Sequence, residues 1–183
     1  VTFTIEKGQV LGVVGESGSG KSTLARVLMK LMLPTSGTIL FDGIEVTKSS
    51  KAELMLLRKR MQIVFQNPAQ SLNPRKTISD ILREPLEFHH IVEPIKLYHH
   101  IEELLEIVGL PFEMASRYPH ELSIGQQQRV AIARAISVKP DFLILDECVS
   151  ALDISVQAQI LNLLQDLQNE FHMTYLFISH DLN

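Results

Sequence analysis

Short apolar runs alternate with longer amphipathic stretches along the chain. The short runs are bounded by turn residues and occur at Val10–Val14, Thr38–Phe41, Gln62–Phe65, Phe142–Leu145 and Thr174–Ile178. Their length and their β-branched residues are typical of buried strands, which need no polar face. We therefore predict a strand at each of these positions.

An amphipathic helix is predicted between the last two of these runs. Val156, Ile160, Leu163 and Leu167 recur with helical spacing, so they share one face of a helix from Ser155 to about Glu170. A strand, a helix and a further strand in succession are typical of a parallel sheet with helical crossovers. The predicted fold class is therefore α/β.

The middle of the chain has a different pattern. From about Asn67 to about Val138 the pattern is helical, and prolines divide it into short pieces. We predict an α/β core with a mostly parallel sheet at residues 1–66 and 139–183, and an inserted helical subdomain at 67–138. Because the chain lacks an initiating Met and stops abruptly, we expect this core to be incomplete at both ends.

The composition narrows the class of protein. Apolar residues make up 45% and charged residues 21% of the 183 residues, which excludes disordered and low-complexity classes. The formal net charge is −4 and no basic block occurs, so we expect no nucleic-acid partner. No apolar run reaches the roughly 18 to 20 residues of a membrane span, so any membrane role is expected to be peripheral.

A phosphate-binding motif follows the first predicted strand. Residues 15–22 fit the pattern G-x-x-x-x-G-K-[ST] and precede a helical stretch at Thr23–Leu33. Glycines let backbone N–H groups turn toward phosphate oxygens, and the helix N-terminus adds a favourable dipole. The predicted nucleotide-binding residues are Gly15, Glu16, Ser17, Gly18, Ser19, Gly20, Lys21, Ser22 and Thr23.

Two side chains of this motif have expected roles. Lys21 is expected to reach the β and γ phosphates of ATP, and Ser22 to place its hydroxyl on Mg²⁺. The sequence therefore predicts a P-loop NTPase. A glycine-rich turn without any ligand is the alternative.

The strand at 142–145 ends in two acidic residues, Asp146 and Glu147. A carboxylate at the carboxyl end of a parallel strand can hold a Mg²⁺ shell, and we assign that role to Asp146. Glu147 lies one residue further and is predicted to polarise the attacking water as a general base. A solvated strand end is the alternative, which the upstream P-loop motif makes less favourable.

The sequence at 122–129, Leu-Ser-Ile-Gly-Gln-Gln-Gln-Arg, is similar to the LSGGQ signature of ATP-binding cassette ATPases. Ser123 and Gln126 have the spacing of a capping box for a helix that runs to about Ser137, so the motif places another anion-binding helix end in the chain. A plain capped helix is the alternative. The resemblance implies that Ser123, Gly125 and Gln126 bind ATP held by a second subunit.

Further residues match the family's motifs in order along the chain. The resemblance implies that Gln66 contacts Mg²⁺ or the attacking water, and that His180 contacts the γ-phosphate. It also implies that the segment from Ser150 to Asp153 crosses to the partner subunit, although Asp153 has an alternative role as a simple helix cap.

The segment after Gln66 resembles the oligopeptide, dipeptide and nickel importers of this family. Asn67-Pro68 and the run Ser71-Leu72-Asn73-Pro74-Arg75 carry this resemblance. It implies an ATPase at the cytoplasmic face of the membrane, dimeric with a second cassette subunit and attached to membrane permease subunits. A solute-binding protein would act only indirectly. A non-transport ATPase of the same family, or an inactive cassette fragment, is the alternative.

Three features depart from the family's pattern or invite other chemistry. Ile124 replaces a glycine of the signature, where a β-branched residue would be strained if φ were positive, or would crowd a phosphate. Cys148 stands where the subgroup usually carries Pro, and we assign it no chemistry. The pairs His89-His90 and His99-His100 are interpreted as solvated surface rather than a metal site, because adjacent helical residues face different directions.

Overall fold

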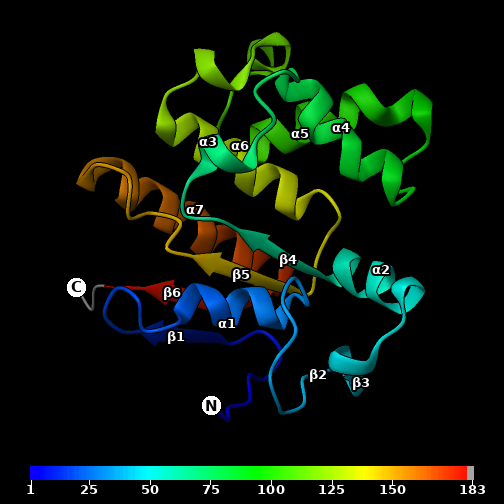
Figure 1. Ribbon diagram of the computed structural model, residues 1–183. Helices are drawn as coiled ribbons and strands as arrows, with labels where there is room; N and C mark the ends of the chain where they lie inside the picture. The colour runs from blue at the N-terminus through cyan, green and yellow to red at the C-terminus, as the bar shows by residue number, and fades with distance from the viewer. Residues whose placement is uncertain (181–183) are drawn as a thin grey trace.

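The computed structural model describes residues 1–180, so the last three residues of the predicted core segment 139–183 lie outside the described residues. Within the described part, β1 (Val10–Val14), β6 (Thr174–Ser179), β5 (Phe142–Asp146) and β4 (Met61–Val64) form a parallel sheet in that order. Figure 1 shows the twisted sheet with helices on both faces. The prediction of a mostly parallel α/β fold is confirmed.

The alternating side chains of β5 supply both faces of this sheet. Phe142 and Ile144 pack in a cluster with Ala25 of α1 (Lys21–Leu28), on one face. Leu143 and Leu145 pack on the opposite face in a cluster that includes residues of α6 (Ile124–Ile136) and α7 (Ile154–Phe171). All five residues of β5 are buried, which explains the continuous apolar run in the sequence.

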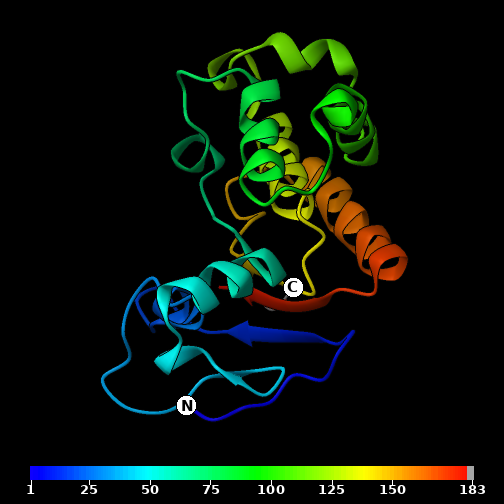
Figure 2. The ribbon, with the colours of Figure 1, turned by 90° about the vertical axis from the view of Figure 1, so that its right-hand side faces the viewer.

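The segment between β4 and β5 contains only helices and turns. It comprises α3 (Pro68–Ser71), α4 (Ile78–Phe88), α5 (Leu97–Ile107), α6 and three 3-10 helices at Pro94–Lys96, Phe112–Ser116 and Pro119–Glu121. Figure 2 shows this helical lobe standing above the sheet. Its buried side chains belong to the same hydrophobic cluster as Leu143 and Leu145 of the sheet. The division at residues 67–138 stays a prediction.

Two of the predicted elements differ in detail. The expected buried strand at Thr38–Phe41 is only a two-residue strand, β2 (Leu40–Phe41), which pairs antiparallel with β3 (Ile44–Glu45). Leu40 is 67% exposed, because this short hairpin lies outside the parallel sheet. The first helix, expected at Thr23–Leu33, ends at Leu28, and Lys30 follows with a left-handed φ of 49°.

Between the hairpin and β4 the chain forms a short 3-10 helix at Val46–Lys48 and then α2 (Lys51–Arg60). Arg60 joins this region to the core, since its guanidinium contacts the carboxylates of Asp42 and Asp141.

No helix within residues 1–180 is long and apolar enough to cross a membrane.

Candidate nucleotide-binding site

The P-loop motif forms an exposed loop between β1 and α1. Gly18 and Gly20 adopt φ values of 80° and 97°, a region that favours glycine, so these two positions need their residue type. Residues 16–20 are all exposed, and the N–H of Ser19 donates to the carbonyl of Glu16 over 3.2 Å. The loop is therefore open to solvent at the start of α1.

Helix α1 begins without a side-chain cap. Its N-cap residue is Gly20, and its first turn, which contains Ser22 and Thr23, carries no acidic side chain. The first N–H groups of a helix have no partner inside the helix and carry the positive end of its dipole. An uncapped, acid-free helix start after an exposed glycine loop suits an anionic ligand.

Lys21 is the first residue of α1 and is only 7% exposed. Its ammonium donates to the carbonyl oxygens of Gly15, over 2.7 Å, and Glu16, over 3.0 Å. It also lies 3.4 Å from a carboxylate oxygen of Glu147. The lysine thus connects both ends of the loop with the acidic end of β5.

Ser22 and Asp146 lie together although 124 positions separate them in the chain. The Ser22 hydroxyl donates to Asp146 Oδ1 over 3.0 Å, and Asp146 is 4% exposed. Burial raises the pKa of the Asp146 carboxyl, while the Ser22 hydrogen bond acts to lower it. A hydroxyl and a carboxylate are hard oxygen donors, so this pair fits Mg²⁺.

The acidic pair does not form a metal cage by itself. Within residues 1–180 no cluster of three or more His, Cys, Asp or Glu side chains could hold a metal ion. Mg²⁺ is usually bound through one or two protein oxygens, with phosphates and water completing its shell. The geometry therefore fits a magnesium ion that arrives with a nucleotide.

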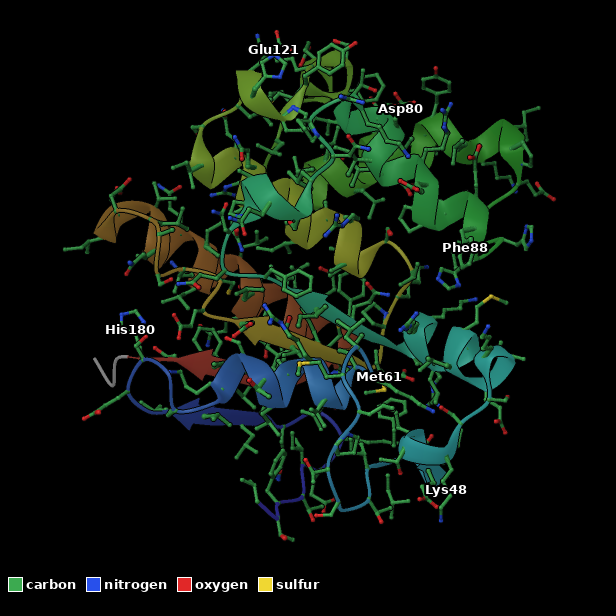
Figure 3. The ribbon with its side chains drawn as sticks, in the orientation of Figure 1. Lys48, Met61, Asp80, Phe88, Glu121 and His180 are labelled. Carbon is green, nitrogen blue, oxygen red and sulfur yellow. The ribbon has the colours of Figure 1, made fainter. Side chains whose placement is uncertain are left out.

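Glu147 is surrounded by polar groups from three separate segments. Its Oε2 accepts a hydrogen bond of 3.1 Å from Gln66 Nε2 and lies 3.4 Å from His180 Nδ1. Its Oε1 faces Lys21. Figure 3 labels His180 at the end of the sheet where the chain terminates. The residues predicted to be catalytic, Glu147, Gln66 and His180, are thus brought together.

The backbone of Glu147 is left-handed, with φ at 48°. This conformation is uncommon for a residue other than glycine and costs about 1 kcal/mol or more, so the surroundings must hold it. The N–H of Glu147 donates to the carbonyl of Ile178 over 3.0 Å. Glu147 contacts Lys21, Gln66 and His180 while Asp146 contacts Ser22, so the two neighbouring acids have different partners.

Gln66 also donates to the hydroxyl of Ser150 over 3.1 Å, and that hydroxyl donates to the carbonyl of Glu147 over 2.9 Å. Among the described residues Gln66 makes no hydrogen bond with Ser22 or Asp146, so its metal-binding role stays a prediction. Sequence reasoning missed the part that Ser150 plays in holding Gln66. The position of Ser150, three residues after Glu147, is the sequence feature that could have indicated this contact.

The signature segment forms the predicted capped helix end. Ser123 Oγ accepts from the N–H of Gln126, over 3.3 Å, and the Gln126 side chain accepts from the N–H of Ser123, over 3.0 Å. Gly125 lies so close to α7 that an added Cβ would meet a methyl group of Val156 at 2.7 Å, so a larger residue there would force that side chain to shift. Among the described residues, Ser123, Gly125 and Gln126 make no hydrogen bond or ion pair with the P-loop.

Ile124 is 53% exposed and lies in the first helical position of α6, without a positive φ. The condition for backbone strain, a positive φ, is therefore not met at Ile124. The second expectation, that Ile124 crowds a ligand, stays a prediction.

Asp153 caps α7. Its carboxylate accepts from the N–H of Val156 over 3.0 Å and from the Ser155 hydroxyl over 2.8 Å, and these bonds hold its pKa below the usual range. Its simple capping role is thus observed, and its contact with a partner subunit stays a prediction.

In the helical lobe His99 and His100 both pair with Glu103, over 3.2 and 3.0 Å.

Residues 1–150 match the family described as ABC transporter. The chain belongs to this family. The ABC transporter family is the one whose signature, P-loop and acidic strand the sequence resembles. The predicted family and the predicted fold class are both confirmed.

Similar ABC transporter proteins include peptide systems. The chain is 51% identical to the oligopeptide transport ATP-binding protein AppF and 50% identical to the oligopeptide transport ATP-binding protein OppF, both of Bacillus subtilis (strain 168). The matches cover 100% of this chain but 56% of AppF and 61% of OppF. The chain thus spans somewhat more than half the length of these relatives.

Solved ABC structures share the fold. The ATP-binding cassette MJ0796, in a dimeric post-hydrolysis state bound to ADP and Pi, has a TM-score of 0.88 at 33% identity, covering 99% of this chain and 78% of that one. The protein cbiO1 from Clostridium perfringens, part of the ABC transporter complex cbiONQ, has a TM-score of 0.84 at 31% identity, covering 99% and 70%.

Proposed function

We propose that this chain is the ATP-binding and ATP-hydrolysing part of an ABC transporter subunit that powers the import of peptides or a related solute. The observation that carries the proposal is the meeting of Lys21, Gln66 and His180 around Glu147, beside the Ser22–Asp146 pair. The names of AppF and OppF support peptides as the solute class.

ATP would lie along residues 15–23, with its phosphates facing the exposed loop and the uncapped start of α1. Lys21 would leave its carbonyl partners to contact the β and γ phosphates. Ser22 and Asp146 would hold Mg²⁺, which neutralises charge on the phosphates. The buried Asp146 carboxyl also fits this role, because a nearby cation favours its charged form.

Glu147 would act as the general base. It is 14% exposed at its side chain, close to polar groups yet free of any role in binding Ser22. Gln66 would orient the attacking water against Glu147, since its amide already contacts that carboxylate. His180 would contact the γ-phosphate of the bound ATP. A cleft of about 310 Å³ lined by Glu147, Ser150 and His180 borders this arrangement.

The second anion-binding helix end supports a head-to-tail dimer. Ser123, Gly125 and Gln126 lie on α6 apart from the P-loop of the same chain, so they would cap ATP held by a second cassette subunit. Asp153 would approach the partner at the same interface. The dimeric state of MJ0796 supports this arrangement.

Further partners follow from the same proposal. The helical lobe at residues 67–138 would contact integral membrane permease subunits, which places the subunit at the cytoplasmic face of the membrane as a peripheral protein. A solute-binding protein would deliver the cargo without touching this chain. No nucleic acid is part of the proposed function, in keeping with the net charge of −4.

The test compares Mg-ATP turnover of the full-length subunit, assembled with its permease, with that of the Glu147→Gln variant. Loss of a positioned base lowers turnover by about 10²- to 10⁴-fold. Glu170→Gln, which changes an exposed carboxylate on α7, is the matched control and is expected to keep wild-type turnover. Nucleotide binding is measured in parallel and is expected to persist in both variants. Equal turnover of the Glu147→Gln variant and the wild type would exclude this site as the hydrolytic one.

A further inference from the structure

Arg134 is a charged residue in the last turn of α6 that no motif explains. Its guanidinium Nη1 donates to the backbone carbonyl of Ser71 over 2.6 Å. The side chain is half-buried, and burial lowers the pKa of its guanidinium. Within residues 1–180 it forms no ion pair, since the nearby Glu84 pairs with Lys76 instead, over 2.8 Å. A half-buried guanidinium whose one hydrogen bond within the described residues goes to a backbone carbonyl indicates that it holds that backbone segment in place.

Ser71 ends the single turn that follows the catalytic Gln66. This turn, α3, starts at Pro68 after Asn67, whose side chain accepts from the N–H of Ala69 over 3.1 Å. Leu72 comes next and is 1% exposed in the main hydrophobic cluster. One helical turn therefore separates Gln66, at the catalytic carboxylate, from an anchor on α6.

The carbonyl of Ser71 and the side chain of Arg134 meet at the wall of a groove. Arg134 and Ser71 both line a groove of about 350 Å³ in the helical lobe, together with Ile81, Pro85 and Phe88. Figure 3 labels Phe88 on this lobe, where the ring is 62% exposed. Leu72 packs against α6 in the main hydrophobic cluster, and Arg134 adds the side-chain hydrogen bond that fixes the Ser71 carbonyl to that helix.

We propose that Arg134 is a positioning residue that keeps Gln66 over Glu147 by anchoring the carbonyl of Ser71 to the signature helix. The anchor joins two parts of the site, since α6 begins at Ser123 and ends beside the segment that carries Gln66. This inference rests on the proposed function, because it assigns Gln66 its effect on hydrolysis. Displacing a positioned group by about 1 Å can lower a rate by about a hundredfold.

The test uses the full-length subunit assembled with its permease and measures kcat and KM for ATP. Arg134→Ala is expected to lower kcat about tenfold or more while KM stays within about twofold, because the P-loop is untouched. Arg134→Lys is expected to recover part of kcat, since an ammonium can still donate to the Ser71 carbonyl. Arg83→Ala, which removes a partly buried arginine of α4 paired with Asp80, is the control and keeps kcat.

Two further measurements separate positioning from general damage. In a Gln66→Ala background, adding Arg134→Ala is expected to lower kcat no further, because the anchor acts through Gln66. Hydrogen exchange at residues 66–72 is expected to rise in Arg134→Ala and not in Arg83→Ala, and this readout needs no activity. Additive losses of kcat, or unchanged exchange at 66–72, would overturn the inference.

The outcomes also distinguish this inference from the proposed function. If the wild type hydrolyses ATP, Glu147→Gln does not, and Arg134→Ala matches the wild type, only the anchor is refuted. If Glu147→Gln matches the wild type but exchange at 66–72 rises in Arg134→Ala, the anchor is real and the proposed catalytic role fails. If Arg134→Ala does not fold, Arg134→Lys is compared with the wild type instead, by kcat and by hydrogen exchange at residues 66–72. Values equal to those of the wild type in both measurements would then refute the anchor.

Discussion

Two helix N-termini in this chain have similar dipoles but opposite local chemistry. Helix α1 has Gly20 as its N-cap, with no side-chain cap and no acidic residue in its first turn. Helix α6 starts at Ser123, where the Ser123 and Gln126 side chains satisfy each other's backbone N–H groups. The start of α1 has no side-chain cap, whereas the capping box at α6 satisfies the N–H groups of Ser123 and Gln126 within the chain.

The difference teaches which end can bind a nucleotide on its own. At α1 the loop glycines and Lys21 leave backbone donors open beside a buried cation, so a phosphate replaces no existing cap. At α6 an anion must compete with a formed capping box, or use the Ser123 hydroxyl as a donor while the box stays closed. In the proposed dimer, the start of α1 therefore contributes most of the ATP affinity, and the start of α6 contacts the ATP only when the two subunits come together.

The largest expected effect comes from removing the cation at α1. Lys21→Ala loses charge-assisted hydrogen bonds worth about 1.5 to 3 kcal/mol, so ATP affinity should fall about tenfold to a hundredfold. Turnover should fall further, because Lys21 also faces Glu147. Titration with a fluorescent nucleotide measures the affinity. Lys51→Ala, at an exposed position of α2, is the control, and an equal dissociation constant for both variants would refute the role of Lys21.

The second effect tests whether the α6 cap is more than a cap. Ser123→Ala and Ser50→Ala each remove the serine of a capping box, at α6 and α2, so each should cost about 1 kcal/mol of unfolding free energy. Only Ser123→Ala should also lower turnover of the assembled transporter, by about tenfold, as loss of one charge-assisted contact predicts. Denaturant unfolding and ATP hydrolysis measure the two quantities. Equal turnover in the two variants would make α6 a purely structural helix end.

A smaller effect is expected at Ile124, which projects from the start of α6. Ile124→Gly should lower KM for ATP by up to about fivefold, or about 1 kcal/mol, if the exposed side chain crowds the approaching phosphate. Ile154→Gly is a matched control, since Ile154 is also the first residue of a helix and 86% exposed. Both variants should lose a similar amount of stability, about 0.5 to 1 kcal/mol or less. A KM that does not change, or that rises, would contradict crowding.

The smallest effect concerns the acid beside Ser22. Because burial raises the folded-state pKa of Asp146 above its ordinary value of 3.8, the folded protein binds this proton more tightly than the unfolded chain. Stability contributed by this group is therefore lost as pH rises through the raised pKa. Asp146→Asn should raise the thermal midpoint at pH 7, without nucleotide, by about 2 °C, and the difference should shrink as pH falls toward 3.8. A lower midpoint for the variant at pH 7 would show that the charged form is stabilised instead.

Local patterns in the sequence predicted the parts of the fold that depend on neighbouring residues. The strand at Val10–Val14 agrees with β1 at both ends, and the strand expected at Phe142–Leu145 is one residue longer as β5. The helix expected from Ser155 to about Glu170 runs from Ile154 to Phe171. The capping box at Ser123 was also predicted, because its chemistry spans three positions.

Contacts between distant segments could not be derived in this way. The apolar run at Thr38–Phe41 looks like a core strand, but its burial depends on a sheet that it does not join. The left-handed turn at Glu147 is set by the carbonyl of Ile178, which no local pattern reveals. Likewise the Arg134–Ser71 bond connects residues 63 positions apart through a groove formed only by the folded lobe.

The buried thiol of Cys148, next to Glu147 in the sequence, gives the chain a chemical reporter of its own. Cys148 is the one cysteine in the sequence, is 1% exposed and has its pKa raised by burial to about 12. A thiol reagent attacks the thiolate, so labelling at neutral pH must wait until this end of β5 opens to solvent. The labelling rate of the unaltered protein therefore measures how often the proposed nucleotide site opens, and its slowing by added nucleotide would report binding without any engineered probe.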